Sequence, residues 1–140
     1  MVNRDLLASK LAELADRVAR VRTCRTTSAE ALSANRDAAE LVSFNLMLAL
    51  QACVDIAGHL VADEGWASAR TLAEGFTRLE EHGVIAPAVA GALRRAVGLR
   101  NVVAHGYAGI DLAIVHRAAT EGLEDVDAFA RSVAAWAASR

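Results

Sequence analysis

Proline and aromatic residues are scarce in this sequence, and their scarcity narrows the choice of fold. One proline and an aromatic fraction of 4% accompany a hydrophobic fraction of 54% in 140 residues. Because proline interrupts helices and marks turns, a single one predicts few breaks and long helices. The apolar content is mostly alanine, leucine and valine, which favours helices packed closely through small side chains. A chain of this length suits one domain, which we expect to span residues 1–140.

Cysteine, lysine and net charge are low as well. Cys24 and Cys53 lie far apart without a Cys-x-x-Cys pair, which predicts neither a zinc ribbon nor a disulfide scaffold and suits a reducing cytosol. The net charge of −2 does not indicate a general nucleic-acid or membrane binder, so any RNA contact has to be local. Lys10 is the one lysine against 14 arginines, a bias that we attribute to a GC-rich bacterial genome.

Long hydrophobic runs are missing too. No apolar run approaches the roughly 18 residues that a membrane span needs, and the first residues are charged at Arg4 and Asp5. We therefore expect a soluble cytoplasmic protein without membrane contact.

Helical periodicity is present in the first half of the chain. Apolar residues spaced three and four apart predict an amphipathic helix over 7–21. Thr27, with Glu30 three positions later, has the form of a capping box, so a second helix should begin there. Its apolar positions continue without a strong breaker, which predicts the longest helix of the chain, ending near Ala62.

The second half continues the pattern. A short apolar stripe stops at Gly83, where a left-handed cap would be needed. Pro87 suits the first turn of a fourth helix that runs to about His105, and Asp111 is a candidate N-cap for a last helix. No segment alternates with period two for long enough to predict a strand. The sequence predicts an all-α, up-and-down bundle of about five helices.

One window of the chain is basic. Between Glu81 and Asp111 there is no acidic residue, whereas Arg94, Arg95 and Arg100 all fall there. Arginines beside a histidine suit phosphate, since the guanidinium fork binds phosphate oxygens and imidazole titrates near neutrality. Most basic windows of this kind are solvated helix faces. The residues around the histidine therefore decide between such a face and a phosphate-binding site.

Those residues resemble the signature of the HEPN superfamily. The segment from Arg100 to Tyr107 reads Arg-Asn-Val-Val-Ala-His-Gly-Tyr; HEPN proteins have an Arg and a His separated by four to six residues, with a polar residue after the Arg. The Tyr two places after the His is the form found in HepT-like toxins. Residues 51–57 and 76–85 also resemble the second and third helices of that family, and the resemblance spans about 37–136.

The resemblance implies a metal-independent endoribonuclease toxin that needs no cofactor. The 2′-hydroxyl of the RNA substrate would attack the adjacent phosphorus, so DNA should resist cleavage. His105 would act as general base or acid, because imidazole has a pKa of about 6.5. Arg100 would stabilise charge on the phosphoryl oxygens. Asn101 would orient His105 or donate to phosphate.

The spacing of the motif bears on the oligomeric state. On a continuous α-helix Arg100 and His105 lie about 140° apart. They can share one phosphate only if the arginine side chain reaches round, if the helix loosens near Gly106, or if a second copy completes the site. The resemblance implies the third option, a homodimer, because HEPN domains usually dimerise with their motifs facing each other across a cleft.

Two further roles come from the resemblance. The family counterpart of Asp55 is a polar residue that faces the cleft and could hold Arg100 or His105; a local i,i+4 pair with His59 is equally favoured. Tyr107 corresponds to the residue to which a partner nucleotidyltransferase, the antitoxin, adds AMP.

The other candidate residues indicate structural roles. The remaining histidines have no metal-ligand spacing and suit surface or capping positions, Cys53 suits the core, and the tryptophans suit packing; these residues are His59, His82, His116, Trp66 and Trp136. No metal site is predicted. Two other functions stay open: a non-catalytic helical module that serves as binding subunit of a nucleotidyltransferase, and a helical structural subunit without RNA contact.

Overall fold

A computed structural model describes residues 2–106 and 109–140, and the described residues form helices without a strand. The helices are α1 (Arg4–Cys24), α2 (Ala29–Ser33), α3 (Arg36–Asp63), α4 (Leu72–Glu81), α5 (Pro87–His105), α6 (Leu112–Ala119) and α7 (Glu121–Ala138). The predicted all-α class is confirmed.

The predicted number of about five helices is wrong, because polar residues divide two of the predicted helices. Ser28, not Thr27, caps the short α2. A second cap follows at Asn35, whose extended backbone (φ −126°, ψ 97°) interrupts the helix and whose side chain accepts a hydrogen bond from Ala38 N at 3.0 Å. Short polar side chains offer the backbone N–H groups an alternative partner and so begin a new helix.

The last predicted helix is divided in the same way. Asp111 caps α6 as predicted and accepts from Ala113 N at 2.9 Å. Thr120 then leaves helical geometry (φ −109°, ψ −87°), and its hydroxyl donates to the carbonyl of His116 at 2.8 Å. The chain resumes as α7 at Glu121.

The other predicted boundaries are confirmed. α3 ends at Asp63, one residue beyond the predicted position. Gly83 has a φ of 73°, in the left-handed region where a side chain would be strained. Pro87 occupies the first turn of α5, which continues to His105.

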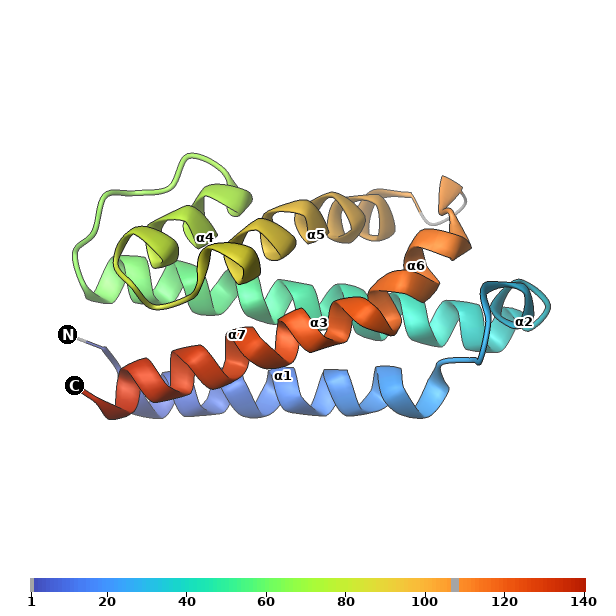
Figure 1. Ribbon diagram of the computed structural model, residues 1–140, viewed down its shortest axis with the longest axis horizontal. Helices are drawn as coiled ribbons and strands as arrows, with labels where there is room; N and C mark the ends of the chain where they lie inside the picture. Colours follow the sequence, from blue (N-terminus) through green and yellow to red (C-terminus); the bar gives the residue numbers. More distant parts are fainter. Residues whose placement is uncertain (1, 107–108) are drawn as a thin grey trace.

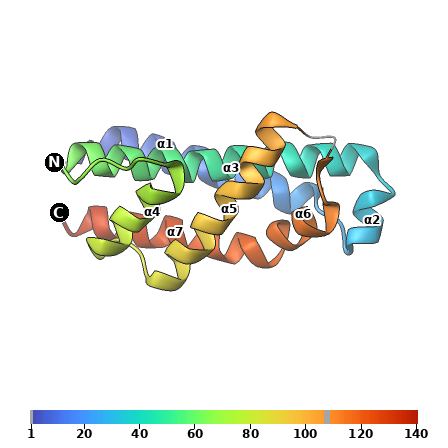
Figure 2. The same ribbon diagram turned by 90° about the horizontal axis from the view of Figure 1, so that it is seen from above.

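α3 forms the centre of the bundle and contacts every other described helix. α1 and α7 lie on one side of it, and α4 and α5 lie on the other (Figure 1). From above, α5 crosses α3 obliquely (Figure 2). This crossing places the C-terminal part of α5, which carries the predicted site, against the middle of α3.

The core is built from the inward faces of these helices. Phe76 of α4 and Phe129 of α7 are fully buried and meet edge to face, with ring centroids 5.7 Å apart. Cys53 lies on the buried face of α3, and burial raises the pKa of its thiol. The prediction that Cys53 is a small core residue is confirmed.

α3 contains a longer apolar stretch than was predicted from the sequence. Among the described helices it alone is long and apolar enough, by length and composition, to cross a membrane. However, 61% of its most apolar stretch is buried inside the bundle. Packing against the surrounding helices accounts for this composition.

Candidate active site

The last turns of α5 carry the three residues predicted to be catalytic. Arg100 and Asn101 are half-buried and His105 is exposed. The helix is regular to its end, because Gly106 N still donates to the carbonyl of Val102 at 2.9 Å. The helix is thus regular between Arg100 and His105 and leaves helical geometry at Gly106 (φ −176°, ψ 83°).

Arg100 is held by two neutral amides. Its Nε donates to Oε1 of Gln51 on α3 at 2.7 Å, and its Nη1 donates to Oδ1 of Asn101 at 2.9 Å. The arginine side chain thus extends toward α3. In the described part of the chain no hydrogen bond joins it to His105.

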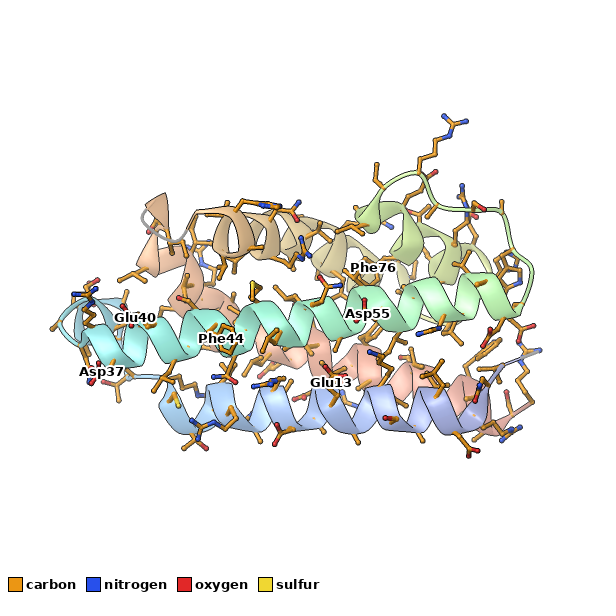
Figure 3. All side chains as sticks on the ribbon, turned by 180° about the vertical axis from the view of Figure 1, so that it is seen from behind. Glu13, Asp37, Glu40, Phe44, Asp55 and Phe76 are labelled. Atoms are coloured by element: carbon orange, nitrogen blue, oxygen red, sulfur yellow. The ribbon has the colours of Figure 1, made fainter. Side chains whose placement is uncertain are left out.

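The predicted supporting residue, Asp55, reaches Arg100 through Gln51. Gln51 Nε2 donates to Asp55 Oδ1 at 2.8 Å, and Asp55 Oδ2 lies 3.6 Å from Nζ of Lys10 on α1. Figure 3 shows Asp55 on α3 beside the neighbouring α1. The described residues show no hydrogen bond or ion pair between Asp55 and His59; the partners of Asp55 are Gln51 and Lys10.

Asn101 contacts Arg100 and not His105. Its carbonyl oxygen accepts from the guanidinium, and among the described side chains it forms no hydrogen bond with the histidine. This contact leaves the Asn101 NH₂ group as a donor. The two expected roles of Asn101, orienting His105 and donating to phosphate, stay predictions.

The charge of Arg100 is more available than that of its neighbour Arg94. Arg94 Nη1 lies 3.0 Å from a carboxylate oxygen of Glu80 and also donates to Thr77. Within the described residues no carboxylate pairs with Arg100. Because phosphate and carboxylate use the same guanidinium fork, Arg100 is the better placed of the two to bind an anion.

An apolar groove of about 510 Å³ runs beside Arg100, between α3 and α5. Phe44, 51% exposed, contributes to its wall together with Met47 and Val103. Figure 3 shows Phe44 and Glu40 along α3, next to the helix end that carries the site. An exposed aromatic side chain in an apolar groove beside a polar site is typical of an interaction surface.

The residues predicted to be structural lie away from this groove. Trp136 is buried, and Trp66 stacks on His82 with ring centroids 4.0 Å apart. His82 caps α4, which confirms the capping role, and His116 lies in the last turn of α6 with its Nδ1 buried and unpartnered among the described atoms. Among the described residues no group of three His, Cys, Asp or Glu side chains could hold a metal ion.

Tyr107 lies outside the described residues, so its role stays a prediction. Gln51 was quoted in the second-helix motif but not identified as a site residue. A signal for it exists: Gln51 and Asp55 are spaced i,i+4 in a largely apolar stretch of α3, and polar groups in such surroundings need partners on neighbouring elements.

Comparison with known proteins identifies the family. Residues 11–133 match the model of the ribonuclease HepT-like family. The chain therefore belongs to the HepT-like family, as the motif predicted.

Two curated relatives are ribonucleases by name. The mRNA nuclease HepT of Shewanella oneidensis is 32% identical over 88 residues, which cover 63% of this chain and 66% of that protein. A putative RNase of Archaeoglobus fulgidus is 37% identical over 83 residues, 57% of this chain and 60% of that protein. The matched parts thus span slightly less than two thirds of these relatives.

A solved structure shows the same fold over nearly the whole chain. It is that of the tri-AMPylated HEPN toxin of Shewanella oneidensis in complex with the MNT antitoxin, with a TM-score of 0.85 and 25% identity, and the match covers 94% of this chain and 98% of the solved one. The fold is that of a HEPN toxin.

Proposed function

We propose that residues 1–140 form one HEPN-type domain that acts as an endoribonuclease toxin, using Arg100, Asn101 and His105 without a metal ion. The observation that carries the proposal is the state of Arg100. It is half-buried, held by the amides of Gln51 and Asn101, and not paired with a carboxylate in the described structure. The helix that carries it ends in the exposed His105, and the relatives are named as ribonucleases.

The chemistry uses the substrate's own nucleophile. The 2′-oxygen of the ribose attacks the adjacent phosphorus, and the bond from phosphorus to the 5′-oxygen breaks. His105, as base, takes the proton of the 2′-hydroxyl, or, as acid, gives a proton to the 5′-oxygen. Arg100 and the NH₂ group of Asn101 donate to the phosphoryl oxygens as their negative charge increases.

We further propose that the site is completed in a homodimer. The support comes from the two options in which a single chain brings Arg100 to His105. α5 is regular from Arg100 to His105, and the Arg100 side chain extends to α3, so neither option has support in the structure. The exposed Phe44 and the apolar Met47 and Val103 line the same groove as Arg100. A second copy seated on this face would cover them and bring its His105 to the first copy's Arg100.

The proposed partner is a nucleotidyltransferase antitoxin that adds AMP to Tyr107. The support is the solved HEPN toxin, which is described as AMPylated and in complex with the MNT antitoxin. Tyr107 follows His105 by two positions. A modification there would bring a negative phosphate and a bulky nucleoside to the residues that bind RNA. Both partners would meet in the cytoplasm.

The test is cleavage of RNA by the purified chain in the presence of EDTA. We expect Arg100→Ala and His105→Ala to lose cleavage and keep their fold, whereas Arg95→Ala, at an exposed position of the same helix, and His59→Ala keep both. End-group analysis should find 5′-hydroxyl ends. Cleavage by His105→Ala would contradict the proposal. A wild-type chain that binds the transferase but never cleaves RNA would favour the non-catalytic binding module.

A further inference from the structure

A chain of polar contacts leads from α1 to the guanidinium of Arg100. Lys10 Nζ lies 3.6 Å from Asp55 Oδ2, Asp55 Oδ1 accepts from Gln51 Nε2 at 2.8 Å, and Gln51 Oε1 accepts from Arg100 Nε at 2.7 Å. We propose that Gln51 is a positioning residue for Arg100 and that Asp55 acts on the site by fixing the orientation of the Gln51 amide. This inference rests on the proposed ribonuclease function.

The direction of the Gln51 amide follows from its two partners. An ionised carboxylate only accepts hydrogen bonds, and the Nε–H of arginine only donates one. The NH₂ end of Gln51 must therefore face Asp55 and its carbonyl end must face Arg100. If the amide were turned over, its carbonyl oxygen would face the Asp55 carboxylate and its NH₂ group would face the Nε–H of Arg100. Both hydrogen bonds would then be lost. Asp55 thus selects the one orientation that binds the arginine.

The charges along the chain keep Arg100 available. The Asp55 carboxylate has its cation in Lys10, so its negative charge is balanced from α1 and not by the arginine. Gln51 is neutral and can hold Arg100 without neutralising it. A glutamate in its place would form an ion pair like that of Arg94 with Glu80. The structure therefore fixes the Arg100 guanidinium without pairing its positive charge with a carboxylate.

The two amides also determine which donors remain for a substrate. A guanidinium has five N–H groups, and Gln51 takes that of Nε while Asn101 takes one of Nη1. Both hydrogens of Nη2 and one of Nη1 are left. Contacts from two helices fix the plane of the guanidinium before RNA binds. The entropy cost of orienting this group is therefore not added to the barrier of the reaction. A misplaced guanidinium would reduce kcat more than it changes KM.

A matched set of variants tests this role by activity. Gln51→Met keeps the length of the side chain and removes both contacts, and Asp55→Leu removes the acceptor that orients the amide. The control is Glu13→Gln, which removes the other carboxylate that pairs with Lys10 and leaves these contacts in place. We expect kcat to fall about tenfold or more in the first two variants, at little change in KM, and to stay near wild type in Glu13→Gln. In the Gln51→Met background, Asp55→Leu should cause no further loss, since Asp55 acts through Gln51.

A second measurement does not depend on cleavage. The Nε–H resonance of Arg100, identified by its loss in Arg100→Lys, should exchange slowly with water in the wild type and in Glu13→Gln, and rapidly in Gln51→Met and Asp55→Leu. If one variant does not fold, the other still tests the same amide.

The outcomes are separable. A wild-type chain that does not cleave RNA removes the proposed function, while the resonance still shows whether Gln51 holds Arg100. Wild-type kcat in Gln51→Met, an unchanged resonance in that variant, or additive losses in the double variant would each overturn the positioning role.

Discussion

At the residue scale, the partners of an arginine determine what else it can bind. Arg78 pairs with Glu74 and Glu81, and Arg94 pairs with Glu80, so a phosphate would have to displace a carboxylate from each of them. Arg100 contacts only neutral amides in the described structure. The difference lies in the neighbours and not in the arginine itself, and it can be reversed by one substitution.

Gln51→Glu is that substitution. It places a carboxylate where a neutral oxygen now lies 2.7 Å from Arg100 Nε, so the charge offered to RNA falls. We expect the affinity for an uncleavable RNA analogue to fall about tenfold, corresponding to the about 1.4 kcal/mol of one weakened charged contact. Fluorescence anisotropy at fixed salt measures it. Glu80→Gln, which frees Arg94 instead, is the control and should leave affinity unchanged; equal losses in both variants would refute the distinction.

Tyr107 is tested by its modification. Incubation with the cognate nucleotidyltransferase and ATP should add one or more AMP units that map to Tyr107, because the phenol supplies the acceptor oxygen. Tyr107→Phe lacks that oxygen, should gain no mass, and should stay toxic beside an active transferase. Intact-mass spectrometry and growth assays measure the two effects. AMP found on another residue of Tyr107→Phe, with restored growth, would contradict the proposed control.

At the scale of helices, the sequence predicted where helices lie better than where each of them begins and ends. The apolar stripes, Gly83 and Pro87 identified most of the helices, because these signals act within one turn of the chain. Asn35 and Thr120 were missed as breaks because a short polar residue on a helix reads like part of its solvated face. Their effect depends on which backbone groups they bond, and neither spacing nor composition records that.

In the site, too, residues close together in the sequence were predicted, whereas a contact between residues far apart in the sequence was not. The motif on α5 places Arg100, Asn101 and His105 within six consecutive residues, so a pattern could find them. The contact of Arg100 with Gln51 joins residues 49 positions apart, and it depends on how α5 crosses α3. The crossing follows from packing of the whole bundle. For that reason the sequence indicated Asp55 but not the amide through which it reaches the arginine.

The cap at the start of α3 can be tested by stability. Asn35→Ala removes the side-chain oxygen that accepts from Ala38 N, and we expect the free energy of unfolding to fall by about 1 kcal/mol. Asn35→Asp keeps an acceptor and should stay close to wild type. Urea denaturation followed by circular dichroism gives both values. An Asn35→Ala variant as stable as the wild type would show that the cap does not stabilise the helix start.

At the scale of the molecule, the proposed catalytic Arg100 and the exposed Phe44 belong to the same groove. Arg100 forms part of the groove whose walls include Phe44, Met47 and Val103. A surface that binds a second copy through these side chains would bury the groove and exclude water from the phosphate contacts. Dimerisation and catalysis would then depend on the same two helices, α3 and α5.

Phe44→Glu tests whether this face joins two copies. The side chain is 51% exposed, so a glutamate should not disturb the fold, but a carboxylate buried in the interface without a partner would disfavour the dimer. We expect a folded monomer with little RNA cleavage, by sedimentation and activity assay. Leu72→Glu, at an exposed apolar position on α4, is the control. A dimeric, active Phe44→Glu variant would place the interface elsewhere.

Mixing two inactive variants tests whether one site draws residues from both copies. If Arg100 of one copy works with His105 of the other, a heterodimer of Arg100→Ala and His105→Ala contains one site with both residues intact and one with neither. With free exchange of subunits, half of the dimers are mixed and half of their sites are intact, so activity should recover to about a quarter of wild type. Each variant alone should stay inactive. A mixture prepared in the Phe44→Glu background should not recover, because its chains cannot pair. If dimers exchange fully, shown by tagged copies, and the mixture still fails to cleave, Arg100 and His105 of a single chain must act together, and the proposed sharing of the site is wrong.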